Sequence, residues 1–182
     1  MMGSSEPFLH DILRPGLDIV FVGAAPSLHS ARIGHWYAGP TNRFYSLLYR
    51  AGFTPRTLLP EEDSTLPEYG IGLTCLFPYL CSSANHLLPE PDDAVRATVT
   101  GKLMRYAPRI ICYNGKDVYR MHIGRECPDW GEQPGIIGVA KVFVVHSSSA
   151  RADRWGAERL ALYRELRALR DALRQEDQHD SA

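Results

Sequence analysis

Residues that could exchange protons or bind an anion gather in four short segments, each directly after an apolar run. A histidine titrates near neutral pH, and serine hydroxyls together with the backbone N–H groups of glycine-rich turns bind phosphates and other anions. The four segments are Gly23 to Ser27, Cys75 to Pro78, Asn114 to Lys116 and His146 to Arg151. One site can use all of them only if the fold brings four distant turns together.

The apolar runs before these segments have the composition of buried parallel strands. Each run is short and rich in β-branched or aromatic residues, and they cover residues 19–22, 71–75, 110–113 and 142–145. Because helical patterns lie between them, we expect a three-layer α/β fold, in which a central, mostly parallel four-stranded sheet carries helices on both faces. Such sheets bind ligands at the carboxyl ends of their strands, where the four polar segments fall.

Apolar residues at helical spacing predict four helices. The predicted helices begin after Thr41 or Asn42, at Asp92 and Asp93, after Asn114 to Lys116, and near Arg154. Gly52 ends the first of them, and the last is expected to run to about Gln175. The arginines of that last helix alternate with acidic residues, as on a solvated surface. The segments 54–67 and 77–91 are expected to be loops.

Length and composition favour one folded domain with its own core. The 182 residues are 45% hydrophobic and 23% charged, which is ordinary for a globular protein. We expect a single domain over residues 1–182, with polar tails at about 1–10 and 176–182. The formal net charge of −1 gives no overall basic field, so any contact with nucleic acid must use a local patch.

The cysteines do not have the spacing of a common metal site. Cys75, Cys81, Cys112 and Cys127 match neither a zinc ribbon nor a usual iron–sulfur run, so we expect reduced, mostly buried thiols and neither metal nor cofactor. The chain has no apolar run of 18 residues, and residues 1–15 lack a basic region followed by an apolar one. We therefore expect a cytoplasmic protein without a membrane segment.

Five pieces of the chain, in order, resemble the uracil-DNA glycosylase superfamily. The likeness spans about residues 13–155 and is greatest to the mismatch-specific branch that includes thymine-DNA glycosylase. That branch has a Gly-Ile-Asn-Pro-Gly turn, a Gly-His-rich loop ending Gly-Pro-x-Asn-x-Phe, and a Ser-rich loop. The matching pieces here are Gly23 to Ser27, Gly34 to Phe44, Tyr69 to Thr74, Asn114 to Lys116, and Ser147 to Arg151. The resemblance implies a glycosylase fold, DNA as the partner, and removal of a flipped-out base without a metal.

The resemblance also assigns roles to individual residues. It places the base against Gly23, Ala24, Ala25, Ser27, Tyr37 and Cys75, with the Tyr37 ring stacked on it. It places DNA against Asn114, Ser147, Ser148, Ser149 and Arg151. Arg43 and Lys116 stand at predicted helix starts, where amide N–H groups also face anions, so they are either further phosphate contacts or solvated surface charges. In this assignment Arg151 enters the gap left by the flipped nucleotide, and the serines hold phosphates. Cys75 stands where thymine-DNA glycosylase has a base-reading amide, which fits a broader pocket.

One position departs from the family pattern. Relatives have an Asn or Asp at the position of Ala25, and that side chain positions the attacking water. An alanine methyl group cannot form a hydrogen bond. Loss of such a group costs on the order of 100- to 10,000-fold in rate, so the activity is weak or another group replaces it. We consider His146 first as a catalytic replacement, then Asn42 and His29. His146 could donate to the departing base, or it could be a structural histidine.

Three functions remain open at this point. The first is a monofunctional glycosylase that removes uracil, with other damaged bases undecided, and leaves an abasic site; no lysine stands at a matched pocket position to support a lyase step. The second is a monomeric protein that binds abasic or damaged DNA without turnover. The third is a small-molecule α/β enzyme, which the absence of Gly-x-Gly-x-x-Gly and Gly-x-x-x-x-Gly-Lys-Ser/Thr motifs disfavours.

Overall fold

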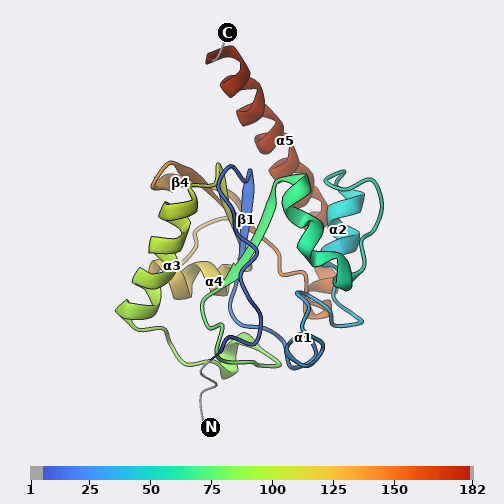
Figure 1. Ribbon diagram of the computed structural model, residues 1–182, viewed down its shortest axis with the longest axis vertical. Helices are drawn as coiled ribbons and strands as arrows, with labels where there is room; N and C mark the ends of the chain where they lie inside the picture. Colours follow the sequence, from blue (N-terminus) through green and yellow to red (C-terminus); the bar gives the residue numbers. More distant parts are fainter. Residues whose placement is uncertain (1–5, 181–182) are drawn as a thin grey trace.

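A five-stranded sheet between two layers of helices forms the body of the protein, in a computed structural model that describes residues 6–180 (Figure 1). The strand order is β2-β1-β3-β5-β4. Four strands run parallel and match the predicted ones: β1 Ile19–Gly23, β2 Ile71–Cys75, β3 Ile110–Asn114 and β5 Ala140–Val145. The α/β fold class is confirmed, but the sheet has one strand more than the four expected.

The additional strand is β4, Gly131–Ile137, which pairs antiparallel with β5 at the edge of the sheet. It contains Pro134 and Gly135, and the pairing register shifts between Gln133 and Ile136. Proline is tolerated there because an edge strand leaves one row of backbone groups unpaired. The Gly/Pro content hid this strand from a search for continuous apolar runs.

Helices cover both faces of the sheet (Figure 1). Helices α2 and α5 pack on one face, and α3 and α4 pack on the other. The helices are α1 Leu28–Ile33, α2 Phe44–Arg50, α3 Asp93–Tyr106, α4 Lys116–Ile123 and α5 Gly156–Asp180. Shorter 3₁₀ segments are η1 Pro60–Tyr69, η2 Asn85–Leu87 and η3 Ala150–Trp155. The four predicted helices are confirmed, whereas α1 and η1 were not predicted, and η1 lies in an expected loop.

Two apolar cores hold these layers together. Alternate strand residues point to opposite faces, so Phe21 packs with Phe44 and Tyr163 on the α2 and α5 side, while Val22 and Tyr113 belong to the other core. Every residue of β1, β2 and β3 is buried. Burial on both faces explains why these strands are continuous apolar runs in the sequence.

The N-terminal segment is packed on the body from residue 8 onward. Leu9 is buried, Ile12 pairs with Leu73 through two backbone hydrogen bonds, and the Phe8 N–H donates to Pro78. Residues 8–10 were expected in a polar tail but are packed on the body, and the His10 carbonyl accepts from Trp36 Nε1 at 3.0 Å. The expected tail residues 1–5 and 181–182 lie outside the described residues. Within residues 6–180 no helix is long and apolar enough to span a membrane.

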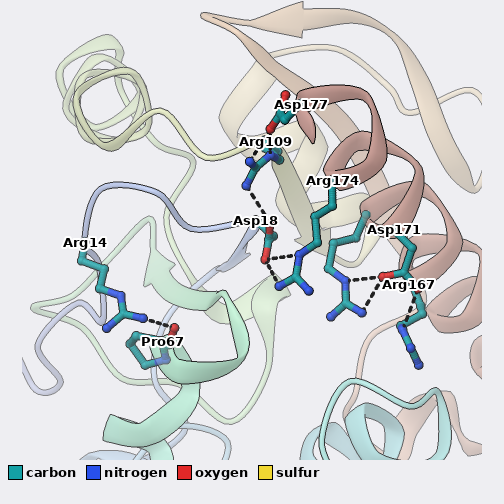
Figure 2. A network of polar contacts seen from close by, with 9 residues as sticks. Arg14, Asp18, Pro67, Arg109, Arg167, Asp171, Arg174 and Asp177 are labelled. Carbon is teal, nitrogen blue, oxygen red and sulfur yellow. Dashed lines mark hydrogen bonds and ion pairs between the residues drawn. The ribbon is translucent and has the colours of Figure 1, made fainter. Parts of the chain in front are cut away.

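An ionic cluster joins α5 to the start of β1. Figure 2 shows the buried Asp18 carboxylate between the guanidinium groups of Arg109 and Arg174. Asp18 accepts from Arg109 Nη1 at 2.8 Å and from Arg174 Nε at 3.1 Å. Because Asp18 directly precedes β1, these contacts fix the long C-terminal helix at the amino ends of the parallel strands.

Candidate functional site

A single cleft lies at the carboxyl ends of the parallel strands. In the sheet, β2 lies on one side of β1 and β3 lies on the other side. The strand order therefore reverses between β1 and β3, and parallel sheets bind ligands at such a point. The cleft has a volume of about 540 Å³ and is lined by residues 23–27, 114–118 and 146–149, together with Arg151. Three of the four predicted segments therefore meet here. The loop after β2 contributes residues 82–86 instead of Cys75 to Pro78.

The first turn, Gly23 to Ser27, is held by backbone hydrogen bonds to the loop after β2. Gly23 O accepts from Leu76 N at 3.1 Å, and Pro26 O accepts from Ser82 N at 3.1 Å. A Cβ on Gly23 would lie 3.3 Å from the Tyr37 hydroxyl, so glycine permits this close approach. Ala25 lines the cleft, and its methyl group offers no polar atom to a ligand.

Tyr37 gives the cleft an aromatic surface. Its ring stacks on Phe44 with centroids 4.2 Å apart, and the residue also lines the cleft. Its backbone has a φ of 52°, a left-handed conformation that is unusual for a residue with a side chain. Burial raises the pKa of the Tyr37 hydroxyl, which stays protonated. The packing on Phe44 fixes one ring face, and a planar ligand can use the rest of the ring.

The serine-rich turn is anchored by Asn114 at the end of β3. Asn114 Oδ1 accepts from Ser148 N at 2.9 Å, and its Nδ2 donates to Ser148 Oγ at 3.1 Å. Arg159 Nη1 donates to the carbonyls of Ser147 and Ser149, both at 3.1 Å. Gly115, at a φ of 120°, lets the chain turn from β3 into α4. Asn114 and Ser148 thus position the turn, and Ser148 is fully buried rather than exposed for a phosphate.

His146 packs against two tryptophan rings inside the cleft. Its ring centroid lies 3.8 Å from that of Trp130 and 5.5 Å from that of Trp155, whose ring is stacked nearly parallel to the imidazole at 9°. His146 is only 6% exposed. Burial lowers the pKa of its imidazole, and Arg159 and Lys116 lower it further, against an opposing effect of Glu158. The imidazole is therefore neutral at pH 7, the form that can both donate and accept.

Three cations of the cleft have no carboxylate partner among residues 6–180: Lys116, Arg151 and Arg154. Lys116 Nζ lies 4.8 Å from the centroid of Trp130, and Arg154 Cζ lies 5.1 Å from that of Trp155. Asp117 is the one carboxylate among the described lining residues. The cleft is thus locally positive in a chain with a formal net charge of −1.

Three residues predicted for the site do not line the cleft. His29 lies on α1, and Cys75 is 1% exposed at the end of β2, where burial raises the pKa of its thiol to about 12. Arg43 is paired with Asp153 at 2.9 Å. Hydrogen bonds from Arg43 and Arg159 lower the pKa of Asp153 to about 2. Arg43 therefore braces the serine-rich turn, and its N–H donates to Ser148.

The remaining predicted residues do line the cleft, with two constraints. Asn42 Oδ1 accepts from the backbone N–H of Phe44, the first residue of α2, at 3.0 Å, so one end of its amide is in use. Ser27 caps α1, accepting from Ser30 N at 3.0 Å. Sequence reasoning missed Trp130, Trp155, Arg154, Asn85 and His86, all of which line the cleft. The sequence signal that could have pointed to the tryptophans is their rarity, since the chain has only three.

The profile of the Uracil DNA glycosylase superfamily matches residues 10–169. The chain belongs to the uracil DNA glycosylase superfamily. Among solved structures, it is similar to a proposed uracil DNA glycosylase from Methanosarcina acetivorans, determined by NMR in solution. The TM-score is 0.57 at 22% identity, with 87% of this chain and 96% of that chain covered. This likeness supports the three-layer fold.

Among residues 6–180 no three His, Cys, Asp or Glu side chains lie close enough to hold a metal ion. The four cysteines are free, and three of them are buried. The side chains of the cleft offer stacking on Tyr37, hydrogen bonding by His146 and Asn42, and the positive charge of the three cations named above.

Proposed function

We propose that this glycosylase superfamily member hydrolyses the N-glycosidic bond of uracil flipped out of DNA and leaves an abasic site. The observation that carries the proposal is one cleft shared by the first turn, the Tyr37 ring, His146 and the serine-rich turn. Its volume of about 540 Å³ lies within the range of small-ligand sites. A base must leave the helical stack to be cut, and a cleft with an aromatic surface can receive it.

The residues of the cleft divide the reaction between them. Tyr37 stacks on the base, and the neutral His146 donates a hydrogen bond to the base oxygen as negative charge develops there. The bond between C1′ and the base nitrogen breaks, water adds its hydroxide to C1′, and its proton ends on the base or the solvent. Asn42, whose Oδ1 is held by Phe44 N just before α2, would orient that water through its amide NH₂ group.

The rate depends on what makes up for the amide missing at Ala25. We propose His146 first, through its hydrogen bond to the departing base, and Asn42 second, through the attacking water. His29 is a weaker proposal, because it lies outside the cleft lining. Arg151 and the hydroxyl groups of Ser147 and Ser149, which accept from backbone N–H groups and can still donate, would hold the flanking phosphates. Placement in the mismatch-specific branch is part of this proposal, since the first-turn, aromatic-loop and serine-loop residues follow that branch's order.

Excision assays test the proposal directly. Oligonucleotides with one uracil, single-stranded and duplex, are incubated with wild type, His146→Ala and the distant control His179→Ala, and alkali-labile sites are counted. We expect wild type and His179→Ala to cut and His146→Ala to be about 100-fold slower or worse. No cutting by wild type at high enzyme excess rejects the function. An unchanged rate for His146→Ala rejects the histidine assignment alone.

Borohydride trapping tests the monofunctional mechanism. Lys116 is the one lysine among the described lining residues, and its Nζ is held against Trp130 and the Pro128 carbonyl at 3.2 Å. A lyase would form a Schiff base through such an amine. We expect no covalent protein–DNA adduct. An adduct that disappears in Lys116→Met would contradict the monofunctional mechanism.

Ala25 favours one second candidate, a monomeric protein that binds abasic or damaged DNA without turnover. The Ala25 methyl group in the cleft cannot position a water molecule, whereas Lys116, Arg151 and Arg154 can still bind DNA. Titration of abasic and intact duplex separates the candidates when read with the excision assay. Selective binding of the abasic duplex without any excision would replace the glycosylase proposal.

A further inference from the structure

Two of the tryptophans that line the cleft have exposed rings. Trp130 is 38% exposed and Trp155 is 40% exposed, whereas Trp36, the third tryptophan of the chain, is 4% exposed. Both exposed rings line the same cleft and both contact His146. Aromatic surface left in water next to a ligand site generally marks a contact with the ligand. We call these two residues the tryptophan pair.

Each ring of the tryptophan pair has a cation over it that forms no ion pair with a carboxylate among residues 6–180. Lys116 lies over the Trp130 ring and Arg154 over the Trp155 ring. Arg120, in the last turn of α4, is instead paired with Glu90 at 2.8 Å. Aromatic rings combined with cations that lack a carboxylate partner match the two parts of a nucleic acid strand, its bases and its phosphates.

We propose that the tryptophan pair stacks unpaired bases that flank the target nucleotide, so that the protein binds single-stranded DNA in preference to duplex. This inference rests on the proposed function in taking DNA as the ligand. A cation over an exposed ring is held more weakly than a base stacked on it. An incoming base therefore displaces Lys116 or Arg154 from the ring, and the freed cation meets the adjacent phosphate.

The preference for a single strand follows from access to the base faces. In a duplex the bases beside the flipped nucleotide stay paired and stacked on their neighbours, so a protein ring cannot cover them without further unstacking. In a single strand those faces are free, and stacking on aromatic side chains tolerates any base. The tryptophan pair would thus add affinity only for the unpaired strand.

Binding of uracil-free DNA tests the inference apart from excision. A labelled 12-nucleotide oligo(dT) and a duplex of equal length are titrated with wild type, Trp130→Ala, Trp155→Ala and their Phe counterparts, with anisotropy as the readout. We expect each alanine variant to bind the single strand about tenfold more weakly and the phenylalanine variants to retain most affinity. Duplex binding should change less than twofold. Tyr49→Ala, an aromatic residue exposed on α2 outside the cleft, is the matched control.

Quenching of tryptophan emission by oligo(dT) gives a readout that needs no variant. We expect strong quenching in wild type, because two of the three tryptophans would stack on bases. The inference is overturned if wild type binds duplex as tightly as single strand, if quenching is absent, or if both alanine variants bind oligo(dT) like wild type. Single-strand binding without excision would leave the inference standing and reject the glycosylase. Excision by wild type, with oligo(dT) binding unchanged in both alanine variants, would leave the glycosylase proposal standing and reject the inference.

Discussion

At the scale of the residue, the site depends on the protonation state of His146. A neutral imidazole can donate to an oxygen that gains negative charge and can also accept from water, whereas an imidazolium can only donate. Burial against the tryptophan pair disfavours the charged form, and the nearby Arg159 and Lys116 do the same. The surroundings of His146 therefore keep it in the form that the proposed chemistry needs.

This protonation state predicts the pH dependence of excision. The pKa of His146 is lowered by burial, so the neutral form persists as pH falls below the ordinary value of about 6.5. Single-turnover excision at saturating enzyme should hold below pH 6.5 and decline only at more acid pH. Trp155→Ala exposes the imidazole, so the decline should move to higher pH. A profile unaffected by Trp155→Ala would show that the ring contact does not set the His146 protonation state.

At the scale of the element, the end of β3 controls the serine-rich turn. Asn114→Ala removes both hydrogen bonds to the buried Ser148 and leaves its N–H without an acceptor. We expect a loss of about 1–3 kcal/mol in the free energy of unfolding, measured in urea, with weaker DNA binding as the turn loosens. Asn114→Asp keeps the acceptor and should lose less. Equal stability for wild type and Asn114→Ala would contradict the anchoring role.

Helix α4 is joined to its neighbours through the buried His122. Tyr113 Oη contacts His122 Nδ1 at 2.6 Å, and Thr100 Oγ1 contacts Nε2 at 3.0 Å. Burial lowers the pKa of His122. The unfolded chain then binds more protons than the folded one below about pH 6.5, so stability is complete above that pH and is lost as pH falls. Melting curves from pH 8 to pH 5 should show this loss, and His122→Phe should reduce the slope. Parallel slopes would refute the His122 contribution.

The sequence predicts elements whose signals are local and misses those made by distant contacts. The runs of β1, β2, β3 and β5 are apolar because both their faces are buried, so composition alone identifies them. β4 was missed because Pro134 and Gly135 interrupt it at a sheet edge. Trp130 and Trp155 are 25 positions apart, and only the β4–β5 hairpin and η3 bring them to His146. No local pattern could have joined them.

The family motifs located the cleft, yet they did not predict how each polar group is used. Ser148 was expected to hold phosphate, but Asn114 and Arg43 take up its polar groups. Cys75 was expected beside the base and is covered by the core. Hydrogen-bond partners depend on side chains from other turns, which a single sequence does not specify.

At the scale of the whole molecule, stability and function are placed at opposite ends of the strands. The cleft lies at the carboxyl ends, whereas Asp18 and its arginines lie at the amino ends (Figure 2). The C-terminal half of α5 extends away from the body on the side opposite α1 (Figure 1). Changes to the Asp18 cluster should therefore alter stability without altering the chemistry of the cleft.

Asp18→Ala tests this separation. The variant loses charged hydrogen bonds to Arg109 and Arg174, whose side chains are 35% and 44% exposed and can be hydrated once freed. We expect a loss of about 2–3 kcal/mol in the free energy of unfolding. Arg174→Met should lose less, because Arg109 still pairs with the buried carboxylate. Excision per folded molecule at 25 °C should match wild type. Arg164→Ala, at an exposed position of α5, is the control for both the free energy of unfolding and the excision rate. A slower reaction in Asp18→Ala at full folding would show that the two ends of the sheet are coupled, because no residue of the Asp18 cluster lines the cleft.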